Sequence, residues 1–288
     1  MNAEANHILI TGAAGFIGQE LTIALLLSSP TIHLTVTDIA TPPIPPQSLV
    51  PDAASRITAL QTDLTHHSRF NAIYLMHGTM SGGAEADLDL GLRVNLDSHR
   101  LILDALRQPT SLHRGTVVVF PSSLAVYVVY EPVGAQHVTE ATCPTPQSSY
   151  GAQKLVIETL VGDYSRRGLI DGRIVRPGAP SAAASSFASG IVRESLKGED
   201  NILPVRPEVI NLPGITVTVA DILNALEVVG GAGARARVIE ERNPQIESIV
   251  ESWPAFFDVS RALSLGLALD ADIVTTVKDF ADRLSSGL

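Results

Sequence analysis

Residues 7–18 read HILITGAAGFIG, and this stretch decides the fold. Its first part, His7–Thr11, is a short apolar run typical of a buried strand, and it leads directly into a turn rich in glycine. Phe16–Leu27 then shows the broad apolar face of a helix, and Ile32–Thr37 has the pattern of a second strand. A strand, a glycine-rich turn, a helix and another strand within about thirty residues predict a βαβ unit.

The glycine turn has the chemistry of a phosphate-binding loop. Glycine lets the chain turn sharply and lets backbone N–H groups approach a pyrophosphate, while the following helix directs its positive dipole end at that anion. The spacing is GxxGxxG rather than GxGxxG, and a glycine trio on its own could be only a tight turn. Because this one follows a strand and opens a helix, we expect it to bind a dinucleotide. The expected contacts are Gly12, Gly15, Phe16, Ile17 and Gly18.

An acidic residue ends the second predicted strand. Asp38 stands twenty residues after Gly18, where a carboxylate can accept hydrogen bonds from the adenosine ribose and would repel a 2′-phosphate. The ten residues after it contain no arginine, so the sequence favours NAD over NADP, although a solvated loop aspartate is the alternative. Asp63 and Leu64, after a third predicted strand, either contact the adenine or form an ordinary turn.

The rest of the chain continues the alternation of strands and helices. The further predicted strands are Arg56–Gln61, Ala72–His77, Thr116–Phe120 and Ile174–Pro177, and the further predicted helices are Asn95–Arg107 and Ser148–Arg167. This order predicts an α/β fold, a Rossmann-type doubly wound parallel sheet, over residues 1–178. Residues 179–288 differ in composition and predict a smaller α/β substrate lobe, with helices at Thr218–Val229 and Ala271–Leu284 and a possible strand at Val238–Glu240.

The composition excludes several classes of protein. With 30 acidic and 20 basic residues among 288, the formal net charge is −10, which argues against nucleic-acid or anionic-membrane binding. The single cysteine, Cys143, excludes an intramolecular disulfide, and the eight histidines lack metal-ligand spacing. No apolar run approaches the ~18 residues that span a bilayer, and the N-terminus has no basic region, so we expect a cytoplasmic protein without metal.

A tyrosine and a lysine four residues apart are the candidate catalytic pair. Tyr150 and Lys154 share one face of a predicted helix, and an ammonium and an oxidised nicotinamide nearby would both favour the phenolate of Tyr150. Tyr150 could then remove a hydroxyl proton while hydride leaves the carbon. Ser123 follows a buried strand, at the sheet edge where ligands bind, and could hydrogen-bond the reacting oxygen or merely satisfy a turn.

Several motifs together resemble the extended short-chain dehydrogenase/reductase superfamily, in its NAD-dependent epimerase/dehydratase branch. They are TGAAGFIG, Asp38, Asp63-Leu64, Asn95, SSLAVY, SYGAQK and VRPG. The resemblance implies a Rossmann domain with a C-terminal substrate lobe, a catalytic set of Ser123, Tyr150 and Lys154, and NAD contacts from Asn95 and Pro177. It also implies a homodimer.

Longer stretches are similar to the D-erythronate dehydrogenase subfamily. They are Ser81–Asn95, Pro146–Lys154, Asp163–Gly168, Ser181–Glu199 and Asn211–Val219. This similarity implies NAD-dependent oxidation at C2 of a four-carbon sugar acid to a 2-oxo acid, with Tyr150 as the base. Expected substrate contacts are Ser81, Ser123, Tyr150 and, for the carboxylate, Arg193, with Arg176 as second candidate. A solvent-facing helix arginine is the alternative for Arg193.

The chain departs from this family at three places. His77 stands where the family has a small residue near the cofactor. The strand that ends in Ile174–Pro177 looks clipped, and about a strand and a helix look absent between Pro207 and Asn211. Two other functions therefore stay open: a nucleotide-sugar epimerase or dehydratase, and an NAD-binding protein with impaired catalysis.

Overall fold

The computed structural model describes residues 6–61, 70–108, 115–127, 138–177, 208–238 and 256–285. Its centre is a seven-stranded sheet in the order β3-β2-β1-β4-β5-β6-β7, and every neighbouring pair of strands is parallel. The strands are β1 (Asn6–Thr11), β2 (Ile32–Thr37), β3 (Ile57–Leu60), β4 (Ala72–Leu75), β5 (Val117–Pro121), β6 (Asp171–Arg176) and β7 (Glu208–Asn211). The predicted Rossmann-type sheet is confirmed.

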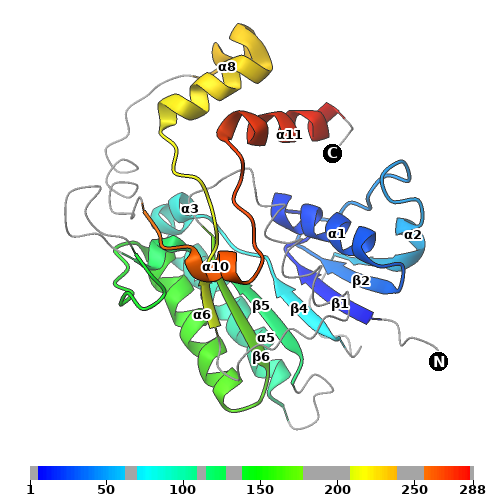
Figure 1. Cartoon of the computed structure of the whole chain (residues 1–288). Helices are drawn as coiled ribbons and strands as arrows, with labels where there is room; N and C mark the ends of the chain where they lie inside the picture. The colour runs from blue at the N-terminus through cyan, green and yellow to red at the C-terminus, as the bar shows by residue number, and fades with distance from the viewer. Residues whose placement is uncertain are drawn as a thin grey trace.

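Helices cover both faces of this sheet (Figure 1). The first half contributes α1 (Phe16–Ser28), α2 (Ala53–Arg56), α3 (Ser81–Ala86), α4 (Leu88–Gly91), the π-helix η1 (Leu92–Asp97) and α5 (Ser98–Leu106). The second half contributes the 3-10 turn η2 (Leu124–Val126), α6 (Ser149–Arg166), α8 (Val219–Arg235), α10 (Ser260–Ser264) and α11 (Ile273–Ser285). Of the predicted helices, those at Phe16–Leu27 and Ser148–Arg167 match α1 and α6 to within one residue at each end.

Successive side chains of a strand point to opposite faces of the sheet, and β1 shows this clearly. On β1, Ile8 and Ile10 belong to the apolar cluster that packs under α1, whereas Leu9 belongs to the cluster that packs under α5 and α6. A strand that is buried on both faces reads as a continuous apolar run, and this is why residues 8–10 contain no polar residue. The strand order reverses between β1 and β4, and ligands of such sheets bind at the carboxyl ends of the strands flanking that point.

β6 corrects the expectation of a clipped strand. It runs over the six residues Asp171–Arg176 and pairs with β5 on one side and with β7 on the other. Gly172 lies within the strand and has a packing role. A Cβ there would lie 2.7 Å from Cγ1 of Val161, so the glycine lets α6 pack closely on β6. The chain beyond the predicted domain boundary at residue 178 thus supplies β7 to the same sheet, and the boundary itself stays a prediction.

The C-terminal helices α8 and α11 pack against each other (Figure 1). α8 begins at Val219, and its cap residue Thr218 forms a capping box with Asp221, so the predicted start at Thr218 is right to within one residue, whereas the helix runs on to Arg235 rather than ending at Val229. The Phe280 ring of α11 meets the Phe16 ring of α1 edge-on, with centroids 5.8 Å apart, so α11 lies at the start of α1. The predicted strand at 238–240 falls mostly outside the described residues. None of the described helices is long and apolar enough to cross a membrane.

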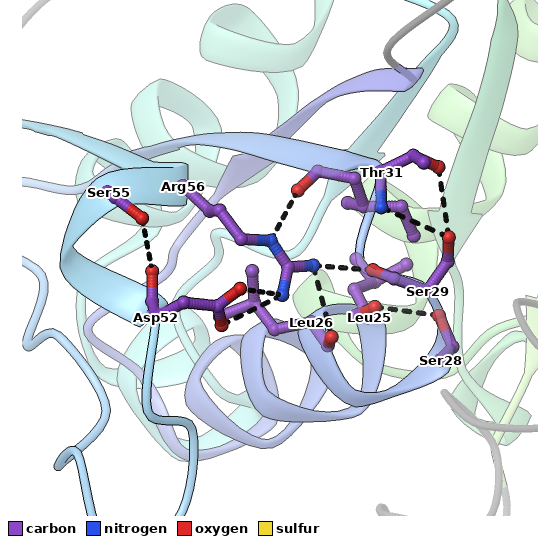
Figure 2. Close-up of polar contacts among 9 residues, drawn as sticks. Leu25, Leu26, Ser28, Ser29, Thr31, Asp52, Ser55 and Arg56 are labelled. Atoms are coloured by element: carbon purple, nitrogen blue, oxygen red, sulfur yellow. Dashed lines mark hydrogen bonds and ion pairs between the residues drawn. The ribbon is translucent and has the colours of Figure 1, made fainter. Parts of the chain in front are cut away.

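A buried arginine joins α1, α2 and β2 (Figure 2). The Arg56 guanidinium donates to the carbonyl oxygens of Leu26, Ser29 and Ile32 at 3.0, 2.5 and 3.0 Å. It also donates to the carboxylate of Asp52, which is half exposed. The carbonyls at the C-terminal end of a helix lack partners within the helix, so Arg56 satisfies the end of α1 and fixes the turn into β2.

We expect Arg56→Ala to lower the free energy of unfolding by about 3 kcal/mol, because three carbonyl groups lose a charged donor in a buried place. Urea unfolding would measure this change. Arg100→Ala is the matched control, since Arg100 pairs with Asp104 at an exposed position. The control should change the free energy of unfolding by less than about 1 kcal/mol. Equal losses in the two variants would contradict the role given to Arg56.

Candidate active site

The glycine turn between β1 and α1 depends on two close backbone approaches. Gly12 has φ +69°, and a Cβ on it would lie 2.5 Å from the backbone nitrogen of His77, at the end of β4. A Cβ on Gly18 would lie 2.3 Å from the carbonyl oxygen of Gly12. Neither position therefore tolerates a larger residue. These contacts place the start of α1 at the carboxyl edge of the sheet.

The start of α1 suits a pyrophosphate. Gly15 is its N-terminal cap residue and supplies no side-chain cap, and the first turn carries no acidic residue. The first N–H groups of a helix have no partner within the helix, so those from Phe16 to Gly18 are available to an anion. The five residues predicted here thus form a cradle that fits the phosphates of a dinucleotide.

Asp38 follows β2 and faces the glycine turn. Its Oδ2 accepts a hydrogen bond from the Ala14 N–H at 2.9 Å, and its Oδ1 accepts one from the Ile39 N–H at 2.6 Å. A carboxylate oxygen has a second lone pair, so both oxygens can still accept from ribose hydroxyls. The contact of Asp38 with a ribose stays a prediction. Asp63 and Leu64 lie outside the described residues.

Tyr150 lies in the first turn of α6, which packs directly on the turn that carries Ser123. Ser148 caps α6, and its Oγ accepts from the Gly151 N–H at 3.1 Å. A Cβ on Gly151 would lie 2.1 Å from the Ala125 carbonyl oxygen, so only glycine allows this approach. The Oγ of Ser123 accepts from the Ala125 N–H at 3.1 Å and is also within hydrogen-bonding reach of Tyr150. Ser123 thus caps a turn, as one of its two interpretations expects, and also lies beside Tyr150, while its contact with a reacting oxygen stays a prediction.

The pKa of Tyr150 corrects one expectation. Burial raises the pKa of the phenol above its ordinary value, and the hydrogen bond with Ser123 only opposes this effect. The sequence predicts a phenol whose pKa the neighbouring ammonium and a bound oxidised nicotinamide both lower. The Lys154 ammonium lies 5.6 Å from the centroid of the Tyr150 ring, and burial outweighs its effect on the pKa of the phenol; the effect of the nicotinamide stays a prediction.

Lys154 is buried one turn further along α6. Its Nζ donates to the Pro121 carbonyl oxygen at 2.9 Å and lies 4.8 Å from the centroid of the Phe120 ring. Burial lowers the pKa of Lys154 to about 8, and the negative charge of Glu158 opposes that shift. Lys154 also faces the loop after β4, because a Cβ on Gly78 would lie 3.8 Å from Nζ. The ammonium is thus held at the carboxyl end of β5.

The loop after β4 is held by an amide pair. Asn95 accepts from the Thr79 N–H at 2.8 Å and donates to the Thr79 carbonyl oxygen at 3.1 Å. It also donates to Oε1 of Gln153 at 2.8 Å, and Gln153 directly precedes Lys154 in α6. Asn95 lies in the π-helix η1, a rare conformation that often occurs at functional sites. Asn95 was predicted, whereas Gln153 was missed, because its partner is 58 residues away in the sequence.

The predicted substrate residues have different outcomes. Ser81 begins α3, which packs on α6, and Pro177 directly follows β6 at the carboxyl edge of the sheet. Arg176 is not available to a substrate carboxylate, because its guanidinium makes a buried bidentate pair with Glu158 at 2.6 and 2.8 Å. Arg193 lies outside the described residues. Among the described residues, no group of three or more His, Cys, Asp or Glu side chains could hold a metal ion.

A Rossmann-type sheet with a glycine turn at the start of a helix, a carboxylate after the second strand, and a serine, a tyrosine and a lysine at the carboxyl edge is typical of nicotinamide-dependent oxidoreductases. Residues 8–206 match the profile of the NAD dependent epimerase/dehydratase family, and the chain belongs to that family. It is an NAD-dependent oxidoreductase.

Named relatives cover nearly the whole chain. It is 38% identical to D-erythronate dehydrogenase of Cupriavidus necator and 32% identical to D-erythronate dehydrogenase of Haemophilus influenzae, and each match covers 96% of this chain and 98% of the relative. A nucleoside-diphosphate-sugar epimerase from Agrobacterium tumefaciens has a similar structure, with a TM-score of 0.72, 28% identity, and coverage of 95% of this chain and 92% of the other. The first alignment spans 335 positions, so that relative has segments that this 288-residue chain lacks.

We expect Gly151→Ala to reduce kcat/KM by at least about 100-fold, because the added methyl group would push Tyr150 and Ser123 apart by a sizeable fraction of an ångström or more. NADH formation in the steady state would measure this loss. Gly233→Ala is the matched control, since a Cβ at Gly233 in α8 meets nothing within 4 Å. If Gly151→Ala stays as active as Gly233→Ala, the close approach of α6 is not required for catalysis.

Proposed function

We propose that the protein oxidises the C2 hydroxyl of a four-carbon sugar acid such as D-erythronate to a 2-oxo acid with NAD. The observation that carries this proposal is the similarity to two D-erythronate dehydrogenases over nearly the whole chain. The cluster of Ser123, Tyr150 and Lys154 at the carboxyl edge of the sheet supports the chemistry, since it contains both a proton acceptor and a group that can orient an alcohol.

Bound NAD would supply the acceptor for the hydride that leaves C2. Tyr150 takes the proton of the C2 hydroxyl, and Ser123 holds that oxygen through its own hydroxyl group. Because burial raises the pKa of Tyr150, the phenolate needs stabilisation by Ser123 and by nearby positive charge. Lys154 provides such charge and binds the nicotinamide ribose in this proposal.

The substrate carboxylate needs a cation. Arg176 is excluded because Glu158 neutralises it, and Arg193 therefore stays the candidate. Ser81, at the start of α3, is a further candidate for contact with the substrate. A homodimer, a cytoplasmic location and a substrate lobe that begins near residue 179 also stay proposals.

A panel of four-carbon and longer aldonates, each offered with NAD and with NADP, tests the proposal. We expect NADH formation with D-erythronate or a stereoisomer and a preference for NAD, because Asp38 would repel a 2′-phosphate. Retained NAD with no net NADH release on any aldonate would instead favour a nucleotide-sugar epimerase, the activity named for the similar Agrobacterium structure. NAD binding without turnover of either substrate class would favour an impaired enzyme.

We expect Tyr150→Phe to lower kcat by about 100- to 10,000-fold while the Kd for NAD stays within a few-fold, because only the proton acceptor is removed. Steady-state kinetics and NAD titration would separate the two effects. Tyr164→Phe is the matched control, since Tyr164 is not among the candidate site residues and its hydroxyl donates to Asp104 on α5. Turnover of Tyr150→Phe at the rate of the control would exclude Tyr150 as the base.

A further inference from the structure

We propose that His77 is a positioning residue for NAD, which holds the end of β4 against the glycine turn and against α5 through a directed chain of hydrogen bonds. His77 follows β4 by two residues, and its ring makes a hydrogen bond at each nitrogen. Nδ1 lies 2.7 Å from Oγ1 of Thr11, the last residue of β1, and Nε2 lies 2.8 Å from Oγ of Ser98, the first residue of α5. One side chain thus links the end of β1, the loop after β4 and the start of α5.

The direction of this chain follows from Ser98. The Ser98 hydroxyl donates its proton to the Val94 carbonyl oxygen at 2.6 Å, so its oxygen must accept from His77. Nε2 of His77 therefore carries the proton, and Nδ1 has the free lone pair. The Thr11 hydroxyl lies closer to Nδ1, at 2.7 Å, than to the Tyr74 carbonyl oxygen, at 3.3 Å, and donates to Nδ1. The chain runs from Thr11 through a neutral imidazole to Ser98 and ends in the π-helix that carries Asn95.

The surroundings keep this imidazole neutral. His77 stacks on His99 with ring centroids 3.9 Å apart, and His99 meets Phe120 edge-on at 5.3 Å. Lys154 lies over the other end of this row, 4.8 Å from the Phe120 centroid. Burial, followed by the charge of Lys154, lowers the pKa of His77 to about 4, and Asp38 opposes the shift. The pKa of His99 is lowered as well, first by burial and then by His77 and Lys154.

The position of the His77 backbone explains why this matters to NAD. The His77 nitrogen is the atom that a Cβ on Gly12 would strike, so the two backbone segments touch at the base of the phosphate cradle. The next residue, Gly78, faces both the Asn95 amide and Lys154. A shift of residues 76–78 would therefore move the glycine turn relative to Lys154. When these residues are already held in place, the protein loses less conformational entropy as NAD binds.

Binding of NAD to His77 variants, measured by calorimetry without any substrate, tests this role. We expect His77→Ala to raise the Kd for NAD by about tenfold or more, because the tie to the glycine turn is lost. His77→Asn retains an oxygen that can accept from Thr11, and His77→Gln retains an amide that can donate to Ser98. We expect the asparagine variant to bind NAD within a few-fold of the unchanged protein and the glutamine variant to remain weak.

Two controls separate positioning from general stability. Thr11→Val should raise the Kd for NAD in the unchanged protein but add little in His77→Ala, because both changes break the same bond. His33→Asn, at an exposed position on β2, should leave the Kd unchanged. Thermal melting of each variant checks folding, and if His77→Ala does not fold, the asparagine and glutamine variants decide. Equal Kd values for these two, or a lowered melting temperature with an unchanged Kd, would overturn the proposal. Neither result depends on the sugar acid.

Discussion

The site depends on backbone segments that approach more closely than any side chain permits. At Gly12 the glycine turn touches the backbone after β4, and at Gly151 the first turn of α6 touches the carbonyl of Ala125. The first contact sets the phosphate cradle beside the end of β4, and the second brings Tyr150 to Ser123. Both contacts lie at the carboxyl edge of one parallel sheet, so the same geometric constraint shapes the candidate cofactor site and the candidate catalytic site.

Close packing of this kind also removes water, and the titratable groups respond together. Burial lowers the pKa of Lys154 and His77 and raises that of Tyr150, so each group is biased toward its neutral form. Only the ammonium of Lys154 then keeps a charge near neutral pH, because its pKa stays at about 8. The two stacked imidazoles add no positive charge beside it. A phenolate that develops on Tyr150 would therefore have the Lys154 ammonium near it in surroundings of low polarity, where that charge acts strongly.

Local sequence pattern was sufficient for the helices and strands whose apolar residues recur with helical or strand spacing. The boundaries of α1, β2 and α6 could be predicted closely because an apolar face and a flanking turn or cap mark each of them. The helix Ser81–Ala86 could not, because its residues SGGAEA are poor in apolar side chains. Its place comes instead from a long-range contact, in which Glu85 accepts from the Ser149 N–H at 2.9 Å.

The candidate site also has features that the sequence predicts and features that only the folded structure shows. Tyr150 and Lys154 could be paired from their spacing on one helix, whereas the raised pKa of Tyr150 could not be foreseen, since it depends on how deeply the helix is buried. The amide pair of Asn95 and Gln153 joins residues far apart in the sequence and needs a π-helix for its geometry, which no local pattern predicts.

The buried ion pair in the second half of the sheet constrains how a substrate can be recognised. Arg176 ends β6 at the carboxyl edge of the sheet. Two nitrogens of its guanidinium donate to the two carboxylate oxygens of Glu158, and the centroid of the Tyr127 ring lies 4.7 Å from the guanidinium carbon. Freeing that guanidinium for a ligand would leave the Glu158 carboxylate unpaired in the interior, which is strongly destabilising. Arg176 therefore holds α6 to β6 and keeps Tyr150 and Lys154 in register with the sheet. Within the described residues, Arg176 therefore has a structural role, and a cation for an acidic substrate has to be sought elsewhere in the chain.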